Sequence, residues 1–201
     1  MIVFARHGRT AINREGRLQG RIDAPLDDTG LAQARALGDV LAAETVRRVV
    51  ASPLLRARAT AEAIADRHGL AVEVEERLIE IDYGEWDGLS LRDVPAADWA
   101  AWRADTAFVP PGGESLVAVT ARVASFCSDV LPGAEGVVVA VSHVSPIKAA
   151  VCWALGIDEA ASWRMQLGVA ALTRIGARPD GGPFLQSFNE TPRVPAASGD
   201  V

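Results

Sequence analysis

The chain of 201 residues has few of the residues that build metal sites, disulfide frameworks or membrane spans. It holds 3 histidines and 2 cysteines, and Cys127 and Cys152 lack the spacing of metal ligands and are expected to be buried as small apolar residues. No apolar run approaches the roughly 18 residues of a membrane span, and Arg6 interrupts the first run too early for a signal peptide. The sequence therefore predicts no metal, no cofactor, no membrane association and a cytoplasmic location.

The charge distribution limits the class of ligand. The formal net charge of -6 argues against general nucleic-acid binding. All but one of the 20 basic residues are arginine, so the abundance of arginine reflects a compositional bias and is no evidence of function by itself. The N-terminal segment is nevertheless locally basic, with Arg6, Arg9, Arg14, Arg17 and Arg21. A local cluster of this kind in an acidic protein suits a small anionic ligand.

Apolar periodicity predicts an alternation of strands and helices in one domain over residues 1–190, followed by a weakly ordered tail at 191–201. Strands are expected at 1–5, 46–51, 71–74, 137–141, 169–175 and 184–188, and helices at 30–44, 53–68, 95–104, 114–130 and 146–155. Thr29 is expected to cap the first helix, and Pro146 to begin the last. This order predicts an α/β fold, a three-layer sandwich with a mostly parallel central sheet and helices on both faces.

Polar side chains suited to phosphate chemistry follow three of these strands. Arg6-His7-Gly8 follows the first, Ser52 to Arg56 follows the second, and Ser142-His143 follows the strand at 137–141. Ligands of such sheets bind at the carboxyl ends of the strands, so three distant segments should meet in one crevice. A neutral imidazole can attack phosphorus while guanidinium groups hold phosphate oxygens. The attacking nitrogen must be unprotonated, so the other ring nitrogen should donate to a fixed acceptor.

Further motifs complete a family pattern over about residues 4 to 148: a glycine-punctuated loop at 13–20, Leu-Ile-Glu-Ile-Asp-Tyr-Gly-Glu-Trp-Asp-Gly at 78–88, and Pro-Gly-Gly-Glu-Ser at 111–115. Together they resemble the histidine phosphatase superfamily, also called phosphoglycerate-mutase-like, and are nearest in type to its broad-specificity and α-ribazole-phosphatase-like members. The resemblance implies that His7 is the nucleophile and forms a phosphohistidine. It also implies the roles of further residues: Arg6, Arg56 and a protonated His143 would bind phosphoryl oxygens, Glu80 would be the proton donor, and Asn13, Gln19, Ser115 and the Val144 amide would contact the substrate.

Several of these assignments have competing interpretations. Asp82 and Glu85 lie close to Glu80, although the spacing to the glycines favours Glu80. Ser115 is equally well placed simply to begin a helix. Val144 replaces the glycine that usually follows the second histidine of the family, which narrows the approach to its amide.

The resemblance implies a metal-independent phosphomonoester hydrolase that acts on a small phosphorylated metabolite. The alternatives are a cofactor-dependent phosphoglycerate mutase and a non-catalytic module that binds a phosphorylated ligand. The mutases carry a longer insertion and an Arg-His-Tyr-Gly element that this chain lacks. Trp99 and Trp102 are expected to form a lid or core face, with selection of an apolar leaving group as a second option. The substrate and the oligomeric state stay open, a homodimer being one possibility.

Overall fold

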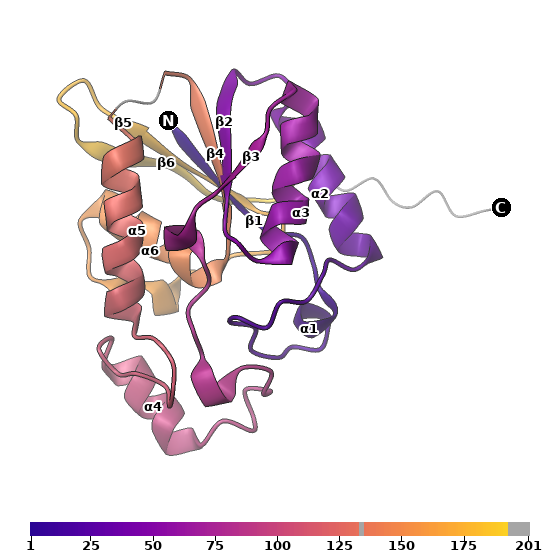
Figure 1. The fold of residues 1–201 in the computed structure, drawn as a ribbon. Helices are drawn as coiled ribbons and strands as arrows, with labels where there is room; N and C mark the ends of the chain where they lie inside the picture. The colour runs from indigo at the N-terminus through magenta and orange to yellow at the C-terminus, as the bar shows by residue number, and fades with distance from the viewer. Residues whose placement is uncertain (133–134, 193–201) are drawn as a thin grey trace.

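The computed structural model describes residues 1–132 and 135–192, which form a six-stranded sheet between two layers of helices (Figure 1). The strands are β1 (Ile2–Arg6), β2 (Val46–Ala51), β3 (Val72–Val74), β4 (Val137–Ser142), β5 (Leu172–Ala177) and β6 (Pro183–Glu190). The helices are α1 (Ala11–Arg14), α2 (Asp28–Leu41), α3 (Leu55–Ala65), α4 (Ala96–Ala104), α5 (Leu116–Val130) and α6 (Val144–Leu155). The strand order is β3-β2-β4-β1-β5-β6, with the first four mutually parallel and the last two antiparallel to their neighbours. The predicted fold class is confirmed.

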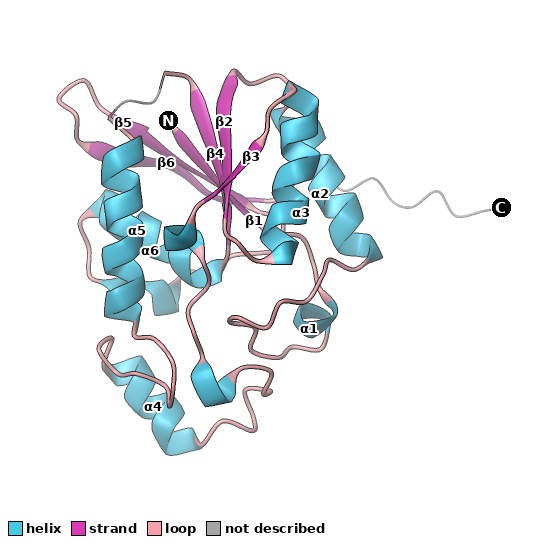
Figure 2. Cartoon of the chain, in the orientation of Figure 1, coloured by secondary structure: helices cyan, strands magenta, loops and turns pink. Residues whose placement is uncertain are grey.

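Each face of the sheet packs against its own pair of helices (Figure 2). Successive side chains of a strand point to opposite faces, so Ile2 and Phe4 of β1 join the core under α5 and α6. Val3 and Ala5 of the same strand join the core under α2 and α3. Burial on both sides explains why β1 and β4 are apolar along almost their whole length.

Helices α2 and α6 begin two residues earlier than predicted, and α3 and α5 begin two residues later. Helix α2 begins after Asp27, whose carboxylate accepts a hydrogen bond from the Gly30 amide at 2.8 Å, so Thr29 lies inside the first turn. Arg9 contacts both residues, pairing with the Asp27 carboxylate and donating to Thr29 Oγ1 at 2.8 Å, so the Thr29 hydroxyl is engaged away from the helix amides. Helix α6 begins after His143, two residues before the expected Pro146, which a first turn accommodates without losing a hydrogen bond.

The remaining differences concern short elements and the chain end. Helix α1 was not predicted, since it is a single turn closed by a capping box between Thr10 and Asn13. The predicted tail at 191–201 falls largely on residues 193–201, which lie outside the described part of the chain.

Cys127 and Cys152 are free and buried, as predicted. Within residues 1–132 and 135–192, no helix is both long and apolar enough to cross a bilayer, and no three His, Cys, Asp or Glu side chains gather as ligands for a metal ion. The absence of a metal requirement stays a prediction.

Candidate active site

The three polar segments meet at the carboxyl ends of β1, β2 and β4, as their positions in the sequence predicted. The parallel register pairs Arg6 with Ser142, so the residues that follow both strands emerge side by side. The rings of His7 and His143 are 5.0 Å apart between centroids and tilted by 56°. Both side chains are buried, which leaves few directions from which a substrate can approach them.

The environment of His7 fixes which nitrogen can react. Its Nδ1 lies 2.7 Å from the Gly8 carbonyl oxygen, and because a carbonyl only accepts, Nδ1 carries the proton. The lone pair is therefore on Nε2. Burial and then the neighbouring guanidinium groups of Arg56 and Arg6 hold the pKa of His7 well below its usual range, which keeps the ring neutral. The Gly8 carbonyl is the fixed acceptor that a nucleophilic histidine requires.

Position 8 of the Arg6-His7-Gly8 motif must be glycine for a steric reason. A Cβ at Gly8 would collide with the Gly30 carbonyl in the first turn of α2, and a Cβ at Gly30 would collide with the Arg9 backbone. The Gly8 amide donates to Thr60 Oγ1 at 3.1 Å, and the Thr60 hydroxyl in turn donates to the Arg56 carbonyl at 2.7 Å. The loop that carries His7 is thus tied to α2 and to α3.

Two arginines supply the positive charge of the site. Arg56 is fully buried, and its guanidinium donates to the carbonyls of Gly20 at 2.7 Å and Ile22 at 2.8 Å. Arg6 donates to the Leu167 carbonyl at 2.7 Å, and its Nε is buried with no partner among the described residues. Burial lowers the pKa of Arg6 to about 10, so it stays charged at neutral pH. Each guanidinium is held by backbone carbonyls and keeps N–H groups free for an anion.

His143 differs from the expectation. Arg56 Nε donates to His143 Nδ1 at 3.2 Å, so that nitrogen carries no proton, and Nε2 donates to Ser52 Oγ at 2.7 Å. Burial and the charge of Arg56 hold the pKa of His143 well below its usual range. The ring is therefore neutral here, whereas the family pattern implied a protonated one. A phosphoryl dianion beside the ring would raise this pKa.

Glu80 is the carboxylate that faces the site. It is buried, and its Oε1 accepts from the Ile81 amide at 2.8 Å and the Ser145 amide at 3.2 Å, while Oε2 accepts from the Val144 amide at 3.1 Å. Burial raises the pKa of Glu80 in spite of these donors and of the nearby arginines. Asp82 instead closes a turn through the Gly84 amide, and the Glu85 side chain is exposed. A raised pKa suits a proton donor, so the structure favours Glu80 over both rivals.

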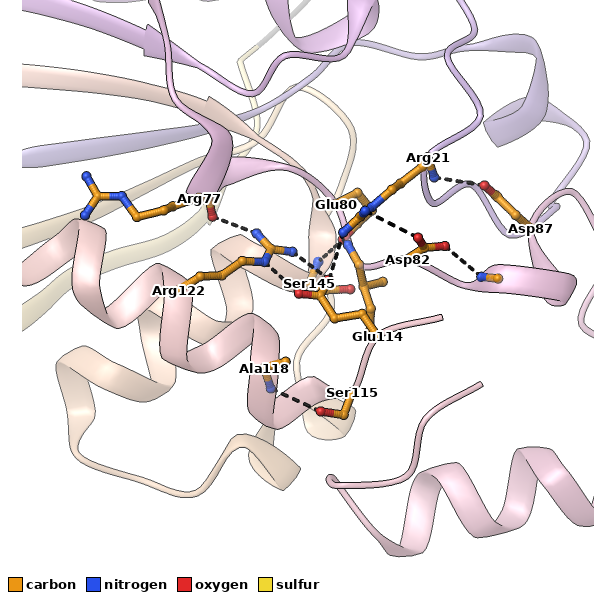
Figure 3. Close-up of polar contacts among 12 residues, drawn as sticks. Arg21, Arg77, Glu80, Asp82, Asp87, Glu114, Ser115, Ala118, Arg122 and Ser145 are labelled. Carbon is orange, nitrogen blue, oxygen red and sulfur yellow. Dashed lines mark hydrogen bonds and ion pairs between the residues drawn. The ribbon is translucent and has the colours of Figure 1, made fainter. Parts of the chain in front are cut away.

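The four residues expected to contact substrate occupy different surroundings. Asn13 Nδ2 and Thr10 Oγ1 both donate to Gln19 Oε1, at 3.1 Å and 2.7 Å, and Gln19 Nε2 is buried without a partner in the described chain. This amide is a donor available to a ligand. The Val144 amide is paired with Glu80 rather than free. Ser115 is the N-cap of α5, accepting from the Ala118 amide at 3.1 Å, so the structure supports its helix-starting role (Figure 3).

A polar network holds the segment that carries Glu80 (Figure 3). Arg122 donates to both oxygens of Glu114, at 2.9 Å and 3.1 Å, and to the Arg77 carbonyl at 2.6 Å. Arg21 lies 3.4 Å from Asp82 and 3.5 Å from Glu114. These contacts fix the backbone on both sides of Glu80 relative to α5.

The sequence interpretation missed two positioning residues. Ser52 fixes the His143 ring from the end of β2, and Thr60 joins the loop that carries His7 to α3. Thr60 had a signal, since it lies one helical turn after Arg56 and on the same face. The sequence contains no signal for the carbonyls of Gly20 and Ile22 that hold Arg56, because every residue has a backbone carbonyl.

The environment of His7 predicts how the reaction depends on pH. A pKa below the usual range means that His7 stays neutral, and therefore nucleophilic, as pH falls through about 6.5. We expect kcat/KM for p-nitrophenyl phosphate, corrected for ionisation of the ester, to be maintained through that range, because this parameter reports the free enzyme. A pH profile measured from 4.5 to 8 tests this. An acid limb at about 6.5 or above would contradict the assignment of a depressed pKa.

Comparison with known proteins agrees with this geometry. The family model described as "Histidine phosphatase superfamily (branch 1)" matches residues 2–191, and the chain therefore belongs to that superfamily. Among curated proteins, it is 34% identical over 195 residues to a bifunctional protein of Mycobacterium tuberculosis, covering 94% of this chain and 54% of that protein. It thus spans about half the length of that relative.

Two phosphatases are similar over most of their length. Phosphoserine phosphatase 1 of Hydrogenobacter thermophilus is 36% identical over 167 residues, covering 81% of this chain and 79% of that protein. The structure of mycobacterial glucosyl-3-phosphoglycerate phosphatase in complex with VO3 superposes with a TM-score of 0.84 at 33% identity, covering 94% of this chain and 98% of that one.

Proposed function

We propose that this protein is a phosphomonoester hydrolase that acts on a small phosphorylated metabolite through a phosphohistidine at His7. The observation that carries the proposal is the arrangement of His7, with Nδ1–H bound to the Gly8 carbonyl and Nε2 unprotonated beside the buried Arg56 and the half-buried Arg6. Relatives named as phosphatases of phosphoserine and of glucosyl-3-phosphoglycerate support the same class of reaction.

Each residue of the site has a separate role in the two steps of the proposed hydrolysis. His7 Nε2 attacks phosphorus, and Glu80 gives a proton to the ester oxygen as the bond to phosphorus breaks. Arg6 and Arg56 balance the charge on the phosphoryl oxygens. Water then attacks the phosphohistidine, its proton passes to Glu80, and inorganic phosphate leaves with His7 neutral again.

Trapping of the intermediate tests the proposal. The protein is mixed with p-nitrophenyl phosphate, quenched in denaturant at alkaline pH, digested, and searched for a phosphorylated peptide. Phosphate on His7 that is lost in acid is the expected result. Turnover without a phosphoenzyme, or phosphate on another residue, would overturn the proposal.

Hydrolysis is expected to need no divalent metal ion. The guanidinium groups of Arg6 and Arg56 lie beside His7 and can balance the charge on the phosphoryl oxygens without a metal ion. Initial rates with p-nitrophenyl phosphate should therefore be equal before and after exhaustive treatment with EDTA. Loss of activity in EDTA that a divalent ion restores would contradict this prediction.

The mutase and binding-module alternatives give different products. Incubation with 3-phosphoglycerate, followed by phosphorus NMR, should show inorganic phosphate and no isomeric ester. An isomeric ester would indicate a mutase, and binding without any turnover across a panel of phosphomonoesters would indicate the non-catalytic module.

A further inference from the structure

A cavity of about 90 Å³ adjoins Glu80 on the side of α4 and α6. Its wall includes Val144 and Ser145, whose amides hold the Glu80 carboxylate. The rest of the wall is Tyr83, Trp99, Trp102, Leu116, Lys148, Ser162 and Trp163. Glu80 would protonate the ester oxygen of the leaving group. The organic part of the substrate, which is bonded to that oxygen, would therefore lie next to this cavity.

The cavity wall carries unused hydrogen-bond donors. Lys148 is the only lysine of the chain, lies half-buried in α6, and has no ion pair or hydrogen bond within residues 1–132 and 135–192. The indole nitrogens of Trp102 and Trp163 are buried and also lack a partner among the residues described. Buried donors usually have partners, so two unpartnered indole N–H groups beside a half-buried ammonium around one cavity indicate a missing acceptor.

The aromatic side chains make this wall firm. The Trp102 ring packs edge-to-face on Trp163 at 4.6 Å, on Trp99 at 5.1 Å and on Tyr83 at 5.7 Å between centroids. Such mutually packed rings have little freedom to turn their N–H groups elsewhere. The volume admits a group of a few heavy atoms.

We propose that this cavity is an anion subsite in which Lys148, with the indole N–H groups of Trp102 and Trp163, binds a carboxylate carried by the leaving group. The preferred substrates are then phosphate esters of small hydroxy acids. A carboxylate matches the site because it only accepts hydrogen bonds, and the ammonium and the two indole N–H groups are donors that cannot accept. The inference rests on the proposed hydrolase function, since it places the leaving group beside Glu80. It differs from the second option given for Trp99 and Trp102, selection of an apolar leaving group, because it places a carboxylate in the cavity.

Burial supports the same assignment. It lowers the pKa of Lys148, an effect that Glu80 partly offsets. An ammonium held in this way gains more from an incoming anion than one in water does, because the local dielectric is lower. When a substrate lacks a carboxylate, the Lys148 ammonium stays unpaired in the cavity, and this cost makes the enzyme discriminate against that substrate.

A matched pair of substrates tests the subsite. 3-Phosphoglycerate and glycerol 3-phosphate differ only in a carboxylate against a hydroxymethyl group, and p-nitrophenyl phosphate reports the phosphatase chemistry alone. In the Lys148→Met variant, kcat/KM for 3-phosphoglycerate should fall roughly 10- to 100-fold, the range for losing a hydrogen bond to a charged group. The values for the other two esters should stay within about threefold, a change too small to reflect a lost charged contact.

Control variants separate local binding from general charge effects. Arg103→Met removes a cation that lies 5.8 Å over the Trp163 ring without lining the cavity, and it should not change the substrate preference. Trp163→Phe removes one donor and keeps an aromatic ring, so it should weaken 3-phosphoglycerate selectively. Equal losses on all three esters in Lys148→Met, or no preference for 3-phosphoglycerate in the parent protein, would overturn the subsite.

A labelling experiment on the parent protein does not depend on how the variants fold. Because Lys148 is the single lysine, cyanate can carbamylate only this side-chain amine and the α-amine, which serves as an internal reference. 3-Phosphoglycerate should slow carbamylation of Lys148 more than glycerol 3-phosphate does at equal occupancy. Equal protection by both esters would count against the subsite. Absence of turnover with p-nitrophenyl phosphate would instead reject the hydrolase function itself.

Discussion

Replacement of His7 by alanine should abolish turnover and phosphoenzyme formation while leaving the fold intact. Of the two site histidines, His7 has an unprotonated nitrogen, Nε2, with no donor bound to it, whereas His143 Nδ1 accepts from Arg56. Loss of the nucleophile in an enzyme with a covalent intermediate lowers kcat by about 10⁴-fold or more. Steady-state rates and acid-labile phosphate, both measured with p-nitrophenyl phosphate, check this.

The chain offers a matched control for the His7→Ala variant. His68 is the only histidine outside the site and follows α3, so His68→Ala should keep both turnover and labelling. The far-ultraviolet circular dichroism of His7→Ala should match the parent, because the only hydrogen bond lost is local to the loop after β1. Residual turnover of more than about 1% in His7→Ala would be too large for the loss of a nucleophile.

Strands and helices that depend mainly on the apolar pattern of their own residues could be predicted from the sequence. Apolar runs buried on both faces predicted β1, β2 and β4, and the alternation with helices predicted the layers. The convergence of His7, Arg56 and His143 followed from the parallel order of these strands and needed no knowledge of loops. This is why the site could be placed with greater certainty than any helix boundary.

Features that depend on distant partners could not be predicted in the same way. The start of α6 is stabilised by Glu80, which lies 64 residues before Val144 and has no local signal at Pro146. For the same reason the contact of the Val144 amide with Glu80 could not be predicted, because its partner is a carboxylate from another segment. The protonation of His143 depended on Arg56 Nε, whose direction is set by the carbonyls of Gly20 and Ile22.

The site concentrates ionisable groups in the protein interior. Arg56, Glu80, His7 and His143 are all buried around the same crevice. Burying charge is costly unless it is paired and hydrogen-bonded, and here the single carboxylate of Glu80 offsets the two arginines only in part. A bound phosphate supplies the negative charge that Arg6 and Arg56 still lack. The site should therefore bind inorganic phosphate more tightly than an exposed pair of arginines would.

Glu80→Gln should damage alkyl phosphates far more than aryl phosphates. An alkoxide leaves only with a proton, whereas a nitrophenolate leaves without one, and a general acid typically contributes 10²- to 10⁴-fold. Glutamine keeps the shape of the side chain and one acceptor oxygen, but its amide group cannot serve as the acid. We expect kcat/KM for a sugar phosphate to fall by about that factor, while p-nitrophenyl phosphate loses less than about tenfold.

Neighbouring carboxylates supply the controls for Glu80→Gln. Asp82→Asn and Glu85→Gln change the rival groups, of which one closes a turn and the other is exposed, and neither should alter the ratio of the two substrates. Because Glu80 also takes the proton from water in the second step, phosphohistidine should accumulate in Glu80→Gln during turnover of the aryl ester. Rapid quenching and quantification of the phosphopeptide measure this. Equal losses on both substrates would move the acid role to another residue, and a missing accumulation would leave Glu80 with the leaving-group step alone.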